Sequence, residues 1–70
     1  MKLKIYKTII SSKTNKVVCY WESDVGFGEF TAEYNPETNE VCHCIDDENV
    51  ISELKEEIIL SLNKILKELN

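Results

Sequence analysis

A tight turn between two β-strands is predicted by the stretch Glu33-Tyr34-Asn35-Pro36-Glu37-Thr38-Asn39-Glu40-Val41-Cys42. Pro36 presets the backbone angle φ for the first corner of a turn, and Asn39 tolerates the positive φ of its end. A similar stretch lies earlier in the chain, Ile9-Ile10-Ser11-Ser12-Lys13-Thr14-Asn15-Lys16-Val17-Val18, with the same Thr-Asn pair before a charged residue and a valine. Both stretches predict hairpins with four-residue loops, at 12–15 and 36–39.

Strands flank these loops, because the residues on either side are β-branched or aromatic. We expect four strands, near residues 2–10, 16–22, 29–35 and 40–45. Two glycines between the hairpins, Gly26 and Gly28, indicate a turn or a bulge there. Two consecutive hairpins predict a four-stranded antiparallel β-meander.

A C-terminal helix is predicted because the hydrophobic period changes from two to about three and a half near residue 48. Asp47 or Asn49 is suited to cap the first turn, and no Gly or Pro interrupts the stretch that follows. The apolar residues that recur three or four positions apart are Ile51, Leu54, Ile58, Leu62, Ile65 and Leu69. The pattern predicts an amphipathic helix over 48–69, so residues 1–70 form a single α+β domain with the helix packed on one face of the sheet.

Strand alternation predicts which side chains the helix covers. In the second hairpin the covered pairs are expected to be Tyr34–Val41, Ala32–His43 and Phe30–Ile45. Cys42 and Cys44 then share the other face. The first hairpin is apolar on both sides, so alternation does not decide between the set Tyr6, Thr8, Ile10, Val17, Cys19, Trp21 and the set Leu3, Ile5, Lys7, Ile9, Val18, Tyr20. Because one helix covers only one face, the other face is expected to contact a second copy or another protein. The alternative is that sheet twist, loops and the chain ends cover part of it.

Composition and charge exclude several classes of protein. The chain has 70 residues, of which 43% are hydrophobic and 30% charged, and it has no apolar run near the roughly 20 residues of a membrane span. Three clustered cysteines are too few for a disulfide framework, which favours a reducing, cytoplasmic location. Residues 1–16 carry five lysines and no acid, whereas residues 17–54 carry ten acids and no lysine or arginine. This separation predicts a dipolar surface, and the net charge of −5 disfavours nucleic-acid binding.

Catalytic and metal chemistry has little support in the sequence. Cys42-His43-Cys44 is the one cluster that suggests a metal, with Cys19 as a further candidate ligand, but a closed zinc site needs four ligands. Buried free thiols are the favoured interpretation. On a strand His43 points away from both neighbouring cysteines, so a Cys–His nucleophile is not expected. We expect neither an enzyme nor a cofactor.

Non-catalytic recognition remains, and the segment 20–30 is its expected place because it gathers the only Trp and both Phe with acids. The expected partner-binding residues are Trp21, Glu22, Asp24, Phe27, Glu29, Glu33 and Glu40. The first hypothesis is a small acidic inhibitor or adaptor, such as a phage or mobile-element product, that occludes a basic surface of a host nucleic-acid enzyme. The second is an oligomeric protein that binds or sequesters a nucleotide through Tyr20, Trp21, Lys7 and Lys55. The third is a structural homodimer or an antitoxin-type subunit.

Overall fold

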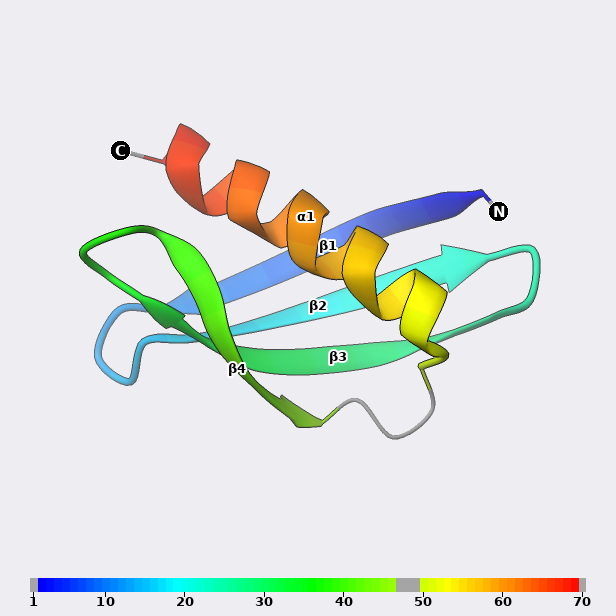
Figure 1. Cartoon of the computed structure of the whole chain (residues 1–70), viewed down its shortest axis with the longest axis horizontal. Helices are drawn as coiled ribbons and strands as arrows, with labels where there is room; N and C mark the ends of the chain where they lie inside the picture. The colour runs from blue at the N-terminus through cyan, green and yellow to red at the C-terminus, as the bar shows by residue number, and fades with distance from the viewer. Residues whose placement is uncertain (1, 47–49, 70) are drawn as a thin grey trace.

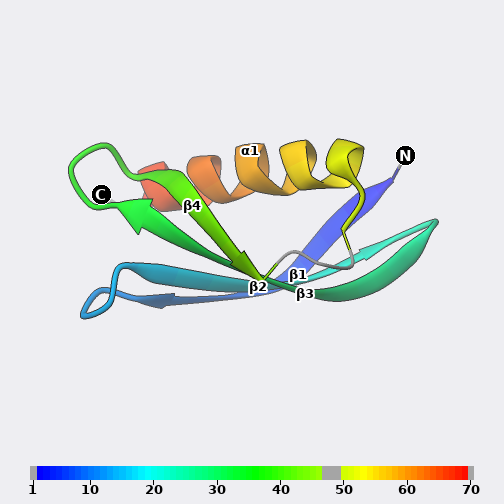
Figure 2. The same ribbon diagram turned by 60° about the horizontal axis from the view of Figure 1, so that its bottom comes forward.

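The structure is a computed structural model that describes residues 2–46 and 50–69. Four antiparallel strands form one sheet in the order β1-β2-β3-β4, and one helix follows them (Figure 1). The elements are β1 (Leu3–Ser11), β2 (Lys16–Ser23), β3 (Gly26–Asn35), β4 (Glu40–Asp46) and α1 (Ser52–Glu68). The helix lies across one face of the twisted sheet (Figure 2). The predicted α+β fold is confirmed.

Both hairpin loops consist of the four residues predicted, 12–15 and 36–39. Each loop ends on an asparagine in the left-handed region, Asn15 with a φ of 55° and Asn39 with a φ of 56°. Asparagine adopts this conformation more readily than other residues that carry a Cβ atom, which explains why both loops end where they do.

The connection between the hairpins is a two-residue turn, Asp24-Val25. The hydroxyl of Ser23 holds this turn: it accepts a hydrogen bond from the Val25 N–H at 3.1 Å and donates one to the Gly26 carbonyl oxygen at 3.3 Å. Gly26 has a φ of +155°, which residues with a side chain rarely adopt. β3 begins at Gly26, which pairs with Ser23, and this is three residues before its predicted start.

A β-bulge in β1 decides which side of the first hairpin is covered. Ile5 pairs with Trp21 and Lys7 pairs with Tyr20, so Tyr6 is an extra residue on β1. One extra residue reverses the alternation of the strand. Ile5 therefore packs against the core with Trp21, whereas Tyr6 is exposed. The expected sets are correct beyond the bulge, where Thr8 and Ile10 share the side of Trp21, and Lys7 and Ile9 share that of Tyr20. They are wrong for Leu3, Ile5 and Tyr6, because they assumed an unbroken ladder.

Two further irregularities change the register of β4. The observed pairs are Thr31–Asp46, Ala32–Cys44, Glu33–His43, Tyr34–Val41 and Asn35–Glu40. The predicted pair Tyr34–Val41 is correct. The predicted pairs Ala32–His43 and Phe30–Ile45 are wrong, because Cys42 and Ile45 are extra residues that ideal alternation does not allow for.

The hydrophobic core lies between α1 and the inward face of the sheet. Leu54, Ile58, Leu62 and Leu66 repeat every four residues along α1 and are all buried. The sheet contributes Val17, Cys19, Trp21, Phe30, Ala32 and Tyr34. Because Leu66 remains in the core, the last full turn of the helix packs against the sheet.

The helix begins later than predicted, at Ser52, and its N-cap residue Ile51 makes no side-chain capping hydrogen bond. The expected caps Asp47 and Asn49 lie outside the described residues. Lys55, on the second turn of α1, is half-buried. The described part of the chain contains no helix long and apolar enough to cross a membrane.

Polar contacts between described residues join α1 to β4. The Oδ1 atom of Asn63 accepts a hydrogen bond of 2.7 Å from the Val41 N–H in a partly buried position. One turn further along, the Lys67 Nζ lies 3.1 Å from Oε2 of Glu40, with both side chains about half exposed. The hydrogen bond to Asn63 gives an acceptor to the Val41 N–H, a backbone donor on the edge strand β4. It also fixes where the helix crosses β4.

Candidate functional site: the outer face of the sheet

The outer face of the sheet, which points away from α1, is a candidate contact surface because no described element lies against it (Figure 2). Register and alternation assign to it Lys4, Lys7, Ile9, Lys16, Val18, Tyr20, Glu22, Phe27, Glu29, Thr31, Glu33 and His43. Apolar side chains on the sheet remain in contact with solvent: Tyr6 is 55% exposed, Ile9 47% and Ile45 45%. Tyr6 and Ile9 are exposed on β1, and Ile45 is exposed at the opposite edge of the sheet on β4.

The strand register arranges these side chains in rows across β1, β2 and β3. The rows are Lys4-Glu22-Phe27, Lys7-Tyr20-Glu29, Ile9-Val18-Thr31 and Ser11-Lys16-Glu33, and β4 adds His43 to the last. In the row of Tyr20, β1 contributes Lys7 and β3 contributes Glu29. In the row of Val18, β1 contributes Ile9 and β3 contributes Thr31. In the row of Tyr20 the outer face thus has a basic side at β1 and an acidic side at β3, whereas β2 carries Glu22 and Lys16 in the outer rows.

An aromatic cluster occupies the basic side of the outer face. The rings of Tyr6 and Tyr20 lie with their centroids 6.3 Å apart and their planes at 33°. The Nζ atom of Lys7 lies 5.8 Å from the centroid of the Tyr20 ring, within the range of a cation–π contact. The bulge at Tyr6 creates this cluster, because it places Tyr6 and Lys7 next to each other on the same side of β1.

The end of the sheet at the β2–β3 turn carries the most exposed aromatic residue of the described chain. We call Glu22, Asp24, Val25 and Phe27 the β2–β3 tip. Phe27 is 80% exposed and Val25 59%, and both acids are exposed. Aromatic side chains that are exposed in a free protein are frequent anchors in complexes, because they bury a large area at little cost in conformational entropy.

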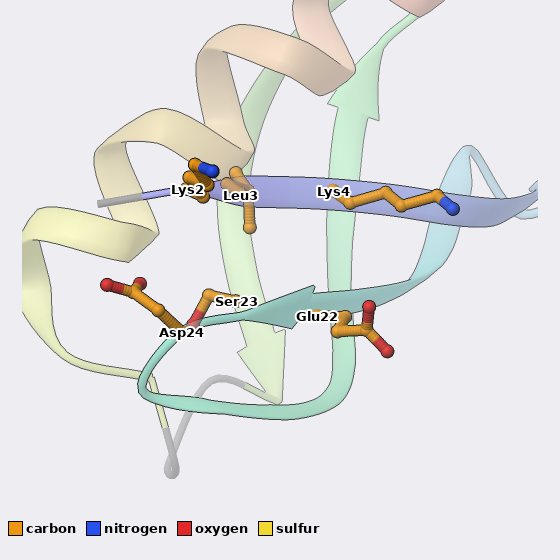
Figure 3. Close-up of a pocket in the computed structure, with 6 residues that line it drawn as sticks. All are labelled: Lys2, Leu3, Lys4, Glu22, Ser23 and Asp24. Carbon is orange, nitrogen blue, oxygen red and sulfur yellow. The ribbon is translucent and has the colours of Figure 1, made fainter.

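An open hollow of about 610 Å³ lies beside this tip, between the beginning of β1 and the end of β2 (Figure 3). Lys2 and Lys4 line one side of the hollow, and Glu22 and Asp24 line the other. The basic N-terminal segment is therefore folded against part of the acidic segment. Basic and acidic side chains that lie far apart in the sequence are therefore close together at this end of the molecule.

The residues expected to bind a partner do not form one site. Trp21 is 2% exposed and lies in the core beneath the tip. Glu33 lies in the row of Lys16 and His43, further along the sheet. Glu40 pairs with Asn35, eight residues along β3 from Phe27 and so roughly 26 Å away.

The residues expected to hold a nucleotide are also divided. Lys7 and Tyr20 lie together on the outer face, as the cation–π contact shows. Trp21 faces the core, and Lys55 lines a shallow hollow between α1 and β4 with His43. These four residues therefore lie on both sides of the sheet and do not line a common pocket.

The cysteines occupy three different environments. Cys19 is fully buried, and desolvation raises the pKa of its thiol to about 11, so it is protonated at neutral pH. Cys42 is exposed, and its thiol donates to the Glu33 carbonyl oxygen at 3.6 Å. Cys44 packs against the core, so the expectation that it shares a face with Cys42 is wrong. Among residues 2–46 and 50–69, no three His, Cys, Asp or Glu side chains are grouped closely enough to hold a metal ion.

Two features of this surface were missed from the sequence. The Tyr6–Tyr20 cluster depends on a bulge for which β1 has no glycine or proline signal. Asn63, a polar residue three positions from Leu66 on α1, could have been noticed as a candidate partner for an edge strand. Comparison of the chain with protein-family models, with curated proteins and with solved structures gave no match.

Proposed function

We propose that this protein is a non-catalytic binding protein that attaches to a partner protein through its β2–β3 tip. The observation that supports the proposal is the 80% exposure of Phe27 beside the exposed acids Glu22 and Asp24. In such an interface the aromatic ring fills an apolar pocket of the partner, and basic groups around that pocket contact the two carboxylates. The two hydrogen bonds of Ser23 hold the turn next to Phe27, which lowers the loss of conformational entropy on binding.

The partner that fits this chemistry is a protein with a basic surface, and a surface that binds nucleic acid is the clearest example. Carboxylates can occupy the positions of phosphates there, because both are anionic hydrogen-bond acceptors. Lys2 and Lys4 face the same hollow as the two acids. The net attraction at the tip is therefore modest, and the apolar contact of Phe27 supplies most of the binding free energy.

The test is affinity capture from an extract of the native host with three full-length baits: the wild type, Phe27→Ser, and Leu60→Ser as the control. Leu60 is 69% exposed on α1, so the control removes a similar apolar group from another surface. A partner should be retained by the wild type and by Leu60→Ser and be lost with Phe27→Ser. The purified partner should then bind the wild type less tightly at high salt, and a DNA duplex should compete for its basic surface.

Two results would contradict the proposal. One is that every retained protein binds all three baits equally. The other is that no protein is retained by the wild type at micromolar bait concentration.

A further inference from the structure

We infer that a pocket at the C-terminal end of α1 binds a neutral small molecule of one or two rings that carries one hydrogen-bonding group. The pocket lies between the end of α1, the end of β1 and the loop that joins β3 to β4, at the opposite end of the sheet from the β2–β3 tip (Figure 1). The residues that line it are Ile10, Tyr34, Pro36, Asn39, Leu66 and Leu69. The inference does not depend on the proposed partner, because none of these residues belongs to the tip.

Core residues form the floor of this pocket. Tyr34 is 8% exposed and Leu66 is 3% exposed, so packing fixes both side chains. Ile10 packs against the same core from β1, and the ring of Pro36 adds a wall whose backbone angle φ is fixed. The pocket is also more enclosed than the hollow beside the β2–β3 tip. A ligand would therefore meet a surface that is largely formed in advance, as in most small-molecule sites.

The volume of the pocket limits the size of its ligand. The pocket has a volume of about 250 Å³. An apolar cavity of roughly 150 Å³ holds benzene, whereas sites for drug-sized molecules start at roughly 300 Å³. One ring or two fused rings therefore fit this pocket, and larger molecules do not.

The hydroxyl group of Tyr34 gives the pocket a polar group on an otherwise buried side chain. This hydroxyl makes no hydrogen bond to another described residue. It is not sealed within the protein, in contrast to Nε1 of Trp21, which is fully buried without a partner. A phenolic hydroxyl can both donate and accept, and buried tyrosines usually have a hydrogen-bond partner. A ligand with one hydroxyl, amine or carbonyl group would supply that partner.

The surroundings of the pocket favour a neutral ligand. No charged side chain of the described residues lines it, so an ionised ligand would lose its hydration without gaining an opposite charge. The C-terminal end of α1, where Leu66 and Leu69 lie, also presents the negative end of the helix dipole. Both effects act against a carboxylate.

Leu69 is the lining side chain that a ligand would cover most. It is 64% exposed, although it lies beside the apolar floor of the pocket. Contact with a ring would remove apolar surface of both groups from water, and this supplies most of the binding free energy. For a ligand of about eleven non-hydrogen atoms we expect a dissociation constant of roughly 0.1–1 mM.

The test is a titration of the full-length, ¹⁵N-labelled protein with 2-naphthol at neutral pH, followed by ¹H–¹⁵N correlation spectra. This probe has two fused rings and one hydroxyl group, and it is uncharged under these conditions. The amide signals of Tyr34, Leu66 and Leu69 should shift and approach saturation with a dissociation constant below about 1 mM. 2-Naphthoate has the same rings and an ionised carboxylate, and it should bind at least about fivefold more weakly.

Two variants with matched controls locate the site. Tyr34→Phe keeps the ring and removes the hydroxyl, and it should weaken 2-naphthol binding about fivefold. Its control, Tyr6→Phe, removes an exposed hydroxyl from the outer face and should leave the dissociation constant within about twofold. Leu69→Ala removes a wall of the pocket and should weaken binding about threefold or more. Its control is Leu60→Ala, which shortens a leucine of similar exposure elsewhere on α1 and should have no such effect.

Three results would overturn the inference. The first is that the signals of Tyr34, Leu66 and Leu69 do not shift with 2-naphthol at up to about 2 mM. The second is that 2-naphthoate binds as tightly as 2-naphthol. The third is that the Tyr34 and Leu69 variants bind 2-naphthol as tightly as their controls.

Discussion

Gly28 lies directly opposite Trp21 in the β2–β3 ladder, and the indole ring occupies the space where a side chain on Gly28 would begin. A Cβ atom there would lie 3.3 Å from Cζ2 of Trp21 and 3.4 Å from Nε1. Trp21 is 2% exposed and enclosed by the core, so it cannot move away easily. Gly28→Ala should therefore lower the free energy of unfolding by about 1 kcal/mol, and Gly28→Val by about 2–3 kcal/mol, measured by urea denaturation.

A double-mutant cycle separates this contact from the general effect of removing a glycine from a strand. In a Trp21→Phe background the nearest indole atoms are absent, so Gly28→Ala should cost at least about 0.5 kcal/mol less than it does in the wild type. An equal cost in both backgrounds would show that the indole does not require the glycine.

The hydrogen bond from the Val41 N–H to Asn63 Oδ1 is expected to matter more for stability than the ion pair one turn away. Asn63→Ala leaves a partly buried N–H without its acceptor and should cost about 1–2 kcal/mol. Lys67→Met removes an ion pair whose members are about half exposed, and it should cost less than about 0.5 kcal/mol. Thermal denaturation of the two variants beside the wild type tests the ranking, and a larger loss for Lys67→Met would reverse it.

Burial of Cys19 makes the free energy of unfolding depend on pH between about pH 9 and pH 11. The pKa of its thiol is about 11 in the folded protein, compared with 9.0 for an unperturbed cysteine thiol. Between these values the folded chain keeps a proton that the unfolded chain loses, so raising the pH favours unfolding. The stabilisation is complete below about pH 9 and is lost towards pH 11, with a total of roughly 3 kcal/mol.

The comparison with Cys19→Ala isolates this effect, because other groups that titrate in this range are common to both proteins. The stability difference between wild type and variant should shrink as the pH rises from 9 to 11. Thiol labelling at pH 8 gives a second readout: Cys42 should react quickly, and Cys19 only when the protein unfolds. Rapid labelling of Cys19 in the folded state would contradict its burial.

Phe27 is expected to contribute almost nothing to folding, since 80% of it is already in water. Phe27→Ser and Leu60→Ser should each change the free energy of unfolding by less than about 0.5 kcal/mol. Circular dichroism and urea denaturation of the two capture baits test this expectation. A loss above about 1 kcal/mol for Phe27→Ser would mean that the ring packs against the protein and is not available as an anchor.

The element order could be predicted because local signals agreed with the tertiary structure. The Pro36 and Asn39 loop, its counterpart ending at Asn15, and the four-residue spacing of Leu54 to Leu66 each act over a few neighbouring positions. Such features are encoded in the adjacent residues themselves, and the strands and helix follow from them.

The assignment of faces could be predicted for β3, where Phe30, Ala32 and Tyr34 lie under the helix as expected, but not for the edge strands, because there it depends on bulges. Tyr6, Cys42 and Ile45 are each inserted into a ladder without a glycine or proline to indicate it. Each insertion reverses the sides of the residues that follow, and what selects it is the packing of the whole sheet against α1. The outer face and its aromatic cluster are therefore properties of the tertiary structure, whereas the exposed Phe27 lies in the segment that the sequence indicated.

The most direct measurement of whether this protein binds a partner through its β2–β3 tip is site-specific photo-crosslinking in the native host. A photoreactive phenylalanine is placed at the position of Phe27 in one version and at the position of Leu60 in another. The account predicts adducts with another protein from the Phe27 position and none of comparable yield from the Leu60 position. Adducts from the Leu60 position alone, or from neither position, would contradict it.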